Sequence, residues 1–140
     1  MMCVSREFEL SSKGNTDIHD VSAQVQRIVT EEGLREGIVT VFTPGATASV
    51  STIEFESGAV ADLKEAVRRA APEDLHYKHD ACWGDGNGFS HVRAALGGPS
   101  LTVPVTSGSL TLGTWQQIIV LDHDNRPRKR RVVVQMMGTE

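Results

Sequence analysis

Two histidines twelve positions apart, His79 and His91, are the residues of this sequence best suited to chemistry. Asp85 and Asn87 lie between them in the segment HDACWGDGNGFSH. Imidazole and carboxylate groups held close together are what a divalent metal ion or acid–base catalysis requires. The spacing matches neither a zinc finger nor an H-E-x-x-H motif, and Asp-Gly-Asn-Gly is also a good turn sequence. A metal or catalytic site and a plain turn with two structural histidines are therefore both open.

A second candidate is the run PGATAS at 44–49, which consists of small and hydroxyl-bearing residues. Such a loop lets backbone N–H groups approach an anion, and Thr47 and Ser49 add hydroxyl donors. No Gly-Lys-Ser/Thr follows, so the loop is not a Walker A motif, and a tight loop between strands is the alternative. Glu54 lies on the strand expected next, on the same face as Val50, where a carboxylate needs a metal or a histidine as partner.

The basic run RPRKRR at 126–131 is the third candidate. On a strand, Arg128 and Arg130 share one face and could bind a phosphate group bidentately. A solvated strand start, or a sheet edge protected by charge, would explain the same residues. His19 and His123 are flanked by acidic residues, and we expect both to be exposed.

Composition narrows the class of protein. The 140 residues, with 39% hydrophobic and 23% charged residues, suit a single domain over 1–140. The net charge of −4 argues against a nucleic-acid binder. Cys3 and Cys82 form no C-x-x-C motif and do not indicate an oxidising compartment. No apolar run approaches the length of a membrane span, so we expect a cytoplasmic protein with no membrane partner.

The elements that must position these residues follow from periodicity and turn signals. A helix is expected to begin at Asp17 and to end at Gly33 or Gly37, a second to run from Ser57 to Pro72, and a short third one to cover 90–96. Trp115 is expected in the core. The expected strands cover 4–10, 38–43, 50–56, 101–105, 110–121 and 128–137, the last returning antiparallel to the one before it. Two to three helices among such strands indicate an α+β fold with a largely antiparallel sheet.

The order of these motifs resembles the YjbQ-like family, also described as secondary thiamine-phosphate synthase enzymes. The segments that carry the resemblance are TASVSTIE, YKHD, WGDGNGFSHVRAALGG, VPVTSGSLTLGTWQQI and RPRKRRVVVQMMG, and they run through almost the whole chain. The resemblance implies a barrel-like sheet and a homotrimer. It also implies a weak transferase activity that joins a pyrimidine diphosphate to a thiazole phosphate and releases pyrophosphate.

The resemblance also implies site residues, since the family's His, Asn, His, Glu and two Arg positions fall on His79, Asn87, His91, Glu54, Arg128 and Arg130. Many members have a histidine at the position of Gly45, so that a metal site would lose a ligand here, or the loop would bind an anion instead.

Together these observations predict that His79 and His91 hold a divalent metal, zinc or magnesium, or act as acid and base. Asp85 and Glu54 would orient them, and Asn87 would donate a hydrogen bond. Phosphate groups of the substrate would be held by Thr47, Ser49, Arg128 and Arg130. A metal-dependent phosphatase, or a non-catalytic binder of a phosphorylated metabolite, are the alternatives.

Overall fold

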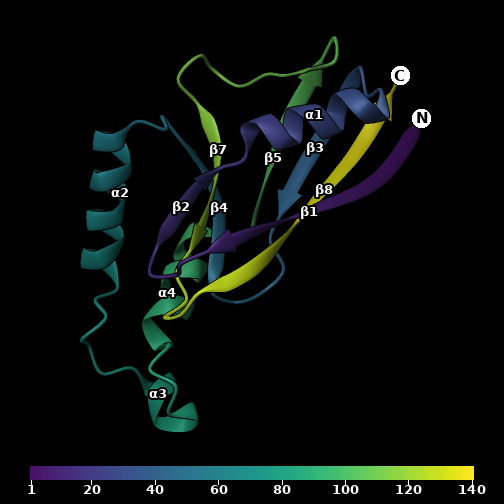
Figure 1. The fold of residues 1–140 in the computed structure, drawn as a ribbon. Coiled ribbons are helices and arrows are strands. Elements are labelled where there is room, and N and C mark those ends of the chain that lie inside the picture. The colour runs from purple at the N-terminus through teal and green to yellow at the C-terminus, as the bar shows by residue number, and fades with distance from the viewer.

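Two antiparallel sheets form the centre of the molecule in the computed structural model, which describes residues 1–140 (Figure 1). The larger sheet has the strand order β1-β8-β3-β5-β6, and the smaller has the order β2-β7-β4. The strands are β1 (Met2–Ser12), β2 (Asp17–Asp20), β3 (Glu36–Phe42), β4 (Ala48–Ile53), β5 (Ser100–Thr106), β6 (Ser109–Leu110), β7 (Gln117–Asp122) and β8 (Arg128–Thr139). All paired strands are antiparallel, which confirms the α+β class and the largely antiparallel, barrel-like sheet.

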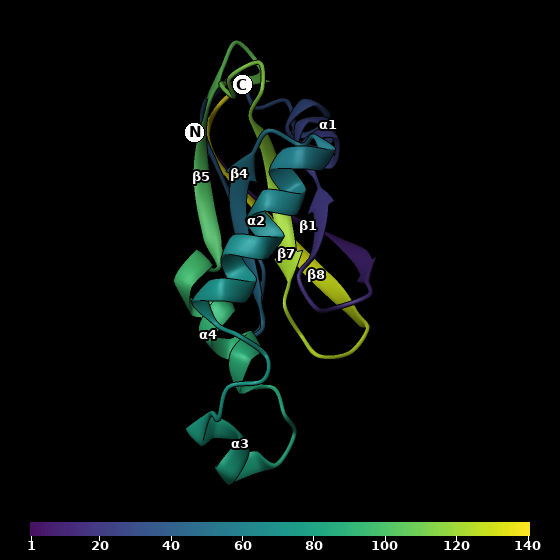
Figure 2. The ribbon, with the colours of Figure 1, turned by 90° about the vertical axis from the view of Figure 1, so that its left-hand side faces the viewer.

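The helices number four instead of the two or three expected. They are α1 (Ser22–Glu32), α2 (Ser57–Ala70), α3 (Lys78–Trp83) and α4 (Gly88–Gly97). Both termini lie at one end of the molecule, and α3 and α4 lie at the other end (Figure 1). Figure 2 shows α3 as the element farthest from the sheets, beyond α4. The short α3 was missed in the sequence because six residues do not establish a helical period.

The hydrophobic core lies between α1 and the inner faces of the sheets. Helix α1 contributes an apolar stripe of Val25, Ile28 and Val29, which are fully buried. Their spacing of three and four residues is that of one helix face. Complete burial of each of these side chains stabilises the fold by about 1.5–3 kcal/mol. The outer face of the larger sheet is different, since Ile38 and Phe42 of the central strand β3 are exposed there.

Helix α1 begins at Ser22, not at Asp17 as expected from the sequence. The chain turns through three residues with positive φ, Gly14, Asn15 and Thr16, and this turn directs it into the short strand β2. There Ile18 pairs with Leu121 of β7. The apolar residue that suggested an early helix turn therefore belongs to the smaller sheet.

The long strand expected over 110–121 was wrong. Strand β6 ends at Leu110, and β7 begins only at Gln117. Between them Gly113 and Gln116 form a local turn, because the Gly113 N–H donates to Gln116 Oε1 and the Gln116 N–H donates to the Gly113 carbonyl, both at 3.0 Å. Trp115, expected in the core, is 72% exposed in this loop.

Strand β8 does not return along β7, as the sequence had indicated. It pairs with β1 and β3 in the larger sheet. The two edges of β7 are already occupied by β2 and β4, so that β8 has no free edge to join there. The turn between β7 and β8 therefore crosses from one sheet to the other.

Two glycines allow the edge of β3 to approach β8. Gly37 and Gly138 face each other across the strands, and a Cβ at Gly37 would collide with the Met137 carbonyl. We expect Gly37→Ala to lower the free energy of unfolding by about 2–3 kcal/mol, because the backbones must separate. Chemical denaturation measures this change. Gly113→Ala is the matched control, since a Cβ there meets only side-chain atoms at ordinary distances, and an equal loss in both variants would contradict this account.

Candidate functional site

The predicted site residues gather at the end of the molecule where α3 and α4 lie. His79 of α3 and His91 of α4 are in contact, with ring centroids 4.3 Å apart and planes tilted by 43°. His79 Nδ1 lies 3.4 Å from Asp85 Oδ1 and 3.6 Å from Asp80 Oδ1. This nitrogen is buried and makes no hydrogen bond. We call His79, Asp80, Asp85 and His91 the histidine corner.

Local hydrogen bonds fold α3 back onto the start of α4. Asp80 Oδ1 accepts the Gly88 N–H at 2.9 Å, and Asp85 Oδ1 accepts the Asn87 N–H at 3.1 Å. Gly84 ends α3 in the left-handed conformation. Tyr77 packs so closely against Gly88 that a side chain at position 88 has no room. The two carboxylates of the histidine corner are therefore fixed by backbone donors.

The ligand-capable atoms of His79, Asp80 and Asp85 lie within 4.8 Å of one another. His91 does not belong to this group, although the sequence suggested His79 and His91 as the metal ligands. The His91 ring packs against the His79 ring, so His91 lies beside the three donors and does not belong to them. The third member of the group is Asp80, which was not among the site residues predicted from the sequence.

A buried charge network lies behind the histidine corner. Asp122 accepts two hydrogen bonds from Arg130, from Nε at 2.7 Å and from Nη2 at 2.8 Å. Arg130 Nη2 also donates to Thr47 Oγ1, and Thr47 Oγ1 donates to Asp124 Oδ2 at 2.9 Å. All four of these side chains are buried. Because a buried ion pair is stable only when its remaining polar atoms are bonded, this network rigidly joins the 44–47 loop to β7 and β8.

Asp124 connects this network to the histidine corner. Its Oδ2 also accepts from Asn87 Nδ2 at 3.3 Å and from Arg128 Nε at 3.1 Å. Burial alone would raise the pKa of Asp124, but the hydrogen bonds from Thr47 and Asn87 and the charge of Arg128 outweigh it and hold the pKa below its ordinary value. Asp124 is thus a stable carboxylate, and Asn87 serves to anchor the start of α4.

A hollow of about 340 Å³ adjoins the histidine corner. Gly45 and Ala46 of the loop line one side, and His91 lines the other, together with Ala94 and Ala95 of α4. Arg130 Nη1 points toward the loop, since a Cβ at Gly45 would lie 3.1 Å from it. A substrate in this hollow would contact His91 and the backbone of the loop.

Similarity to known proteins shows the family of this chain. The family described as "UPF0047 protein YjbQ-like" matches residues 6–139. This chain belongs to the UPF0047 YjbQ-like family. A UPF0047 protein of Archaeoglobus fulgidus is 40% identical over 131 residues, which cover 94% of this chain and 99% of that protein. Another from Methanothermobacter thermautotrophicus is 36% identical over 138 residues, which cover 99% of this chain and 94% of that protein.

Solved structures of UPF0047-like proteins share the fold. A YbjQ-like protein of unknown function from Sulfolobus solfataricus superposes with a TM-score of 0.93 at 26% identity, with 99% of each chain covered. A member of the yjbq/upf0047 family from Clostridium acetobutylicum has a TM-score of 0.86 at 28% identity and covers 94% of this chain and 99% of that one. None of the helices of the UPF0047 chain has the length and apolar character needed to cross a bilayer.

The structure does not bring every predicted residue of this UPF0047 protein to the histidine corner. Glu54 is exposed beyond the far end of β4, six residues from Ala48 and so about 20 Å along the strand from the Asp122 end. The expected pairing with a histidine is therefore absent. Thr47 and Arg130 are committed to Asp122 and Asp124, and Ser49 bonds to His123 at 3.0 Å. Of the four predicted phosphate ligands, only Arg128 is both near the histidine corner and partly exposed, at 38% of its side chain.

His123 was expected to be exposed, and this was wrong, since it is only 1% exposed. Strand β7 is buried on both of its faces from Ile118 onward, and this burial continues through the Asp122-His123-Asp124 run, which lies among β4, β8 and the ends of α2 and α4. The sequence did contain a signal for this burial. The acidic run is followed, after one short turn, by the oppositely charged Arg128 and Arg130, which can pair with it. His19, which was also expected to be exposed, is half-buried and bonds to Asp17 at 2.9 Å.

Burial, supported by the nearby charge of Arg93, lowers the pKa of His123 from 6.5 to about 4. The unfolded chain therefore binds one more proton than the folded chain between these values, and stability must fall as the pH falls from 6.5 toward 4. We expect this histidine to account for a loss of about 3 kcal/mol over that window. His123→Gln should remove this part of the slope, as measured by urea denaturation at a series of pH values. Parallel slopes for the wild type and the variant would contradict the assignment.

Proposed function

We propose that this UPF0047 protein is a transferase that joins a pyrimidine diphosphate to a thiazole phosphate, with the histidine corner as the reaction site. One observation carries the proposal. His79 Nδ1 is buried, has no hydrogen-bond partner, and lies between two carboxylates beside a hollow lined by His91. A buried nitrogen left without a partner is costly in a purely structural site, so its position indicates a ligand.

A divalent metal fits the residues present. His79, Asp80 and Asp85 would hold it, one imidazole and two carboxylates within the span of a coordination sphere. Three protein ligands leave positions open for a substrate, which is the arrangement of catalytic metal sites. Such a donor set suits zinc and, through its carboxylates, magnesium. When bound, the ion would neutralise charge on the diphosphate.

The chain's own residues would serve the departing diphosphate. In the transfer, a bond forms between the thiazole ring nitrogen and the methylene carbon while the bond from that carbon to the diphosphate oxygen breaks, and the diphosphate leaves with the electron pair. The ring nitrogen carries no proton, so no base is needed, and the barrier falls chiefly through donors aimed at the leaving oxygens. His91 faces the hollow and would donate a ring N–H to a leaving oxygen there. Arg128 uses only Nε in its hydrogen bond to Asp124, so its remaining N–H groups are free for phosphate.

The activity assay that tests this proposal uses purified protein with a pyrimidine diphosphate, a thiazole phosphate, and magnesium or zinc. Joint formation of thiamine phosphate and pyrophosphate, dependent on both precursors, is expected. Release of phosphate from a generic phosphate ester without the joint product would instead indicate a metal-dependent phosphatase. A saturable thermal shift with the precursors but no turnover would indicate a non-catalytic binder, and either result would overturn the proposed transfer.

A homotrimer also belongs to this proposal. The outer face of the larger sheet carries Ile38, Phe42 and Met137, all exposed, with Ile38 directly opposite Met137. Adjacent exposed apolar side chains on one sheet face support contact with other copies of the chain. Native mass spectrometry should give three times the chain mass of 15.2 kDa. Ile38→Lys should shift the mass to that of a single chain, and a monomeric wild type would contradict the trimer.

A further inference from the structure

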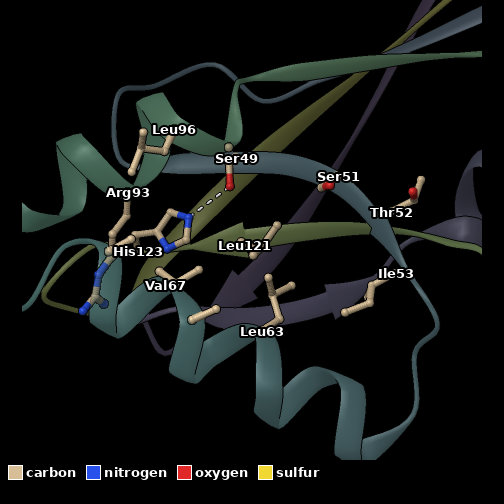
Figure 3. A pocket seen from close by; sticks show the side chains of 13 residues that line it. Ser49, Ser51, Thr52, Ile53, Leu63, Val67, Arg93, Leu96, Leu121 and His123 are labelled. Atoms are coloured by element: carbon tan, nitrogen blue, oxygen red, sulfur yellow. Dashed lines mark hydrogen bonds between the residues drawn. The ribbon is translucent and has the colours of Figure 1, made fainter.

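A second hollow, of about 290 Å³, lies on the other side of α4, between α2 and the smaller sheet (Figure 3). Its walls are mainly aliphatic: Ile53, Leu63, Val67, Leu96 and Leu121. Arg93, Leu96 and Gly97 present one side of α4 to this hollow, whereas His91, Ala94 and Ala95 present another side to the hollow at the histidine corner. The two hollows are therefore separate, and the hollow between α2 and the smaller sheet has no part in the proposed transfer.

The hollow exists because α2 packs on the sheet only near its start. Val60 and Leu63 rest against the small cluster of Ile18, Ile119 and Leu121, but no residue of α2 is fully buried. Farther along the helix Val67 lines the hollow together with the small Ala66 and Ala70. Small side chains over an aliphatic floor leave a space of the size that small-molecule sites begin to have.

A relay of buried polar groups closes the inner end of the hollow. Arg93 Nη1 donates to Thr16 Oγ1 at 3.2 Å, and Thr16 Oγ1 lies 2.8 Å from His123 Nδ1. On the other side of the ring, His123 Nε2 lies 3.0 Å from Ser49 Oγ, the bond drawn in Figure 3. Ser49, His123 and Arg93 line the hollow, and each is at least nine-tenths buried.

The relay fixes the direction of each hydrogen bond. Thr16 accepts from Arg93, so its single hydroxyl proton is left to donate, and His123 Nδ1 is the acceptor within reach. The proton of the neutral ring is then on Nε2 and is donated to Ser49 Oγ. The Ser49 hydroxyl proton is left without an acceptor in the protein, although the side chain is 1% exposed. Gly97 packs directly against this hydroxyl, which leaves the hollow as the place for an acceptor.

We infer that this hollow binds an uncharged, mainly aliphatic molecule whose carbonyl oxygen accepts a hydrogen bond from Ser49. The aliphatic walls take the body of the molecule, and the single free donor takes its oxygen. A carboxylate fits less well. The guanidinium of Arg93 lies beyond His123 and points away from the hollow (Figure 3), where Nε donates to the Ala71 carbonyl at 2.9 Å, Nη1 donates to Thr16, and the group packs over the Phe89 ring. The low pKa of His123, about 4, keeps the ring uncharged at neutral pH. A charged group at Ser49 would meet one neutral donor in apolar surroundings.

The test uses 2-octanone as the probe, with binding followed by chemical shifts of backbone amides in the full-length protein at neutral pH. Saturable shifts that centre on β4, α2 and α4 are expected. Ser49→Ala should weaken binding about tenfold, the effect of one lost hydrogen bond. Ala70→Leu, which fills the hollow from an exposed position of α2, should abolish binding. Ala61→Leu, on the same helix but outside the hollow, is the matched control and should bind as the wild type does.

Four results would overturn the inference. The first is absence of saturable binding by the wild type, and the second is unchanged affinity in both Ser49→Ala and Ala70→Leu. The third is tighter binding of octanoate than of 2-octanone, which would assign an anion to the hollow. Covalent labelling of Ser49 by a fluorophosphonate would likewise contradict the relay, because it requires His123 Nε2 to accept the serine proton. A single cooperative thermal transition in Ser49→Ala, even at a lower Tm because His123 Nε2 loses its acceptor, is the check that the variant keeps the fold.

Discussion

Asp122→Ala is expected to lower the free energy of unfolding by about 3–5 kcal/mol. Arg130 is only 8% exposed, and its Nε and Nη2 both donate to Asp122. Removal of the carboxylate leaves a buried guanidinium, and the nearest other carboxylate oxygen, that of Asp124, lies 3.8 Å away. For a chain of this length, such a loss corresponds to a fall in Tm of about 10 °C or more. Chemical denaturation and calorimetry measure both quantities.

The surface pair of Glu7 and Arg131 is the matched control. Its atoms are 3.6 Å apart and both side chains are more than half exposed. Glu7→Ala should therefore change the free energy of unfolding by less than about 1 kcal/mol. In Asp122→Ala/Arg130→Met the unpaired charge is also removed, and part of the stability should return. A double variant less stable than Asp122→Ala alone would show that the cost arises elsewhere.

His79→Ala is expected to reduce the affinity of the protein for a divalent metal by about 100-fold or more. The variant removes the nitrogen that lies 3.4 and 3.6 Å from the Asp85 and Asp80 oxygens, and outer-shell changes alone cost metal sites 10–100-fold. Isothermal titration with zinc chloride measures the change.

Two further histidines separate a specific loss from a general one. His76 is exposed three residues before His79, so His76→Ala should leave the affinity unchanged. His91 lies against the His79 ring but outside the group of donors. His91→Ala should accordingly retain metal and lose transfer activity. Loss of metal affinity in His91→Ala equal to that in His79→Ala would instead favour a site shared by the two imidazoles.

Much of the fold of this UPF0047 chain was predictable where one face of an element is buried and the other is solvated. Helix α1 shows this, because Val25, Ile28 and Val29 repeat at helical spacing. Prediction failed where local hydrogen bonds replace a periodic pattern. The Gly113–Gln116 turn interrupts a sequence whose pattern predicts one long strand. No residue type indicates that the chain passes from the smaller sheet to the larger one between β7 and β8.

The candidate site divides in the same way. The meeting of His79 and His91 was inferred because both sit in one short polar segment, whose turn residues return the chain on itself. The position of Glu54 could not be inferred in this way. Alternation along a strand shows on which face a side chain lies, but it does not show which end of the strand is near the site. His123 was missed because acidic neighbours indicate exposure unless their cationic partners, here Arg128 and Arg130, are known to be close in space.

The most direct test of the histidine corner is the anomalous diffraction of a crystal soaked in zinc chloride and measured at the zinc edge. A peak is expected between His79 Nδ1 and the carboxylates of Asp80 and Asp85, with the ring of His91 beside it and outside bonding distance. A crystal with zinc bound elsewhere and no density between these three side chains would contradict the metal site and, with it, the role assigned to this corner.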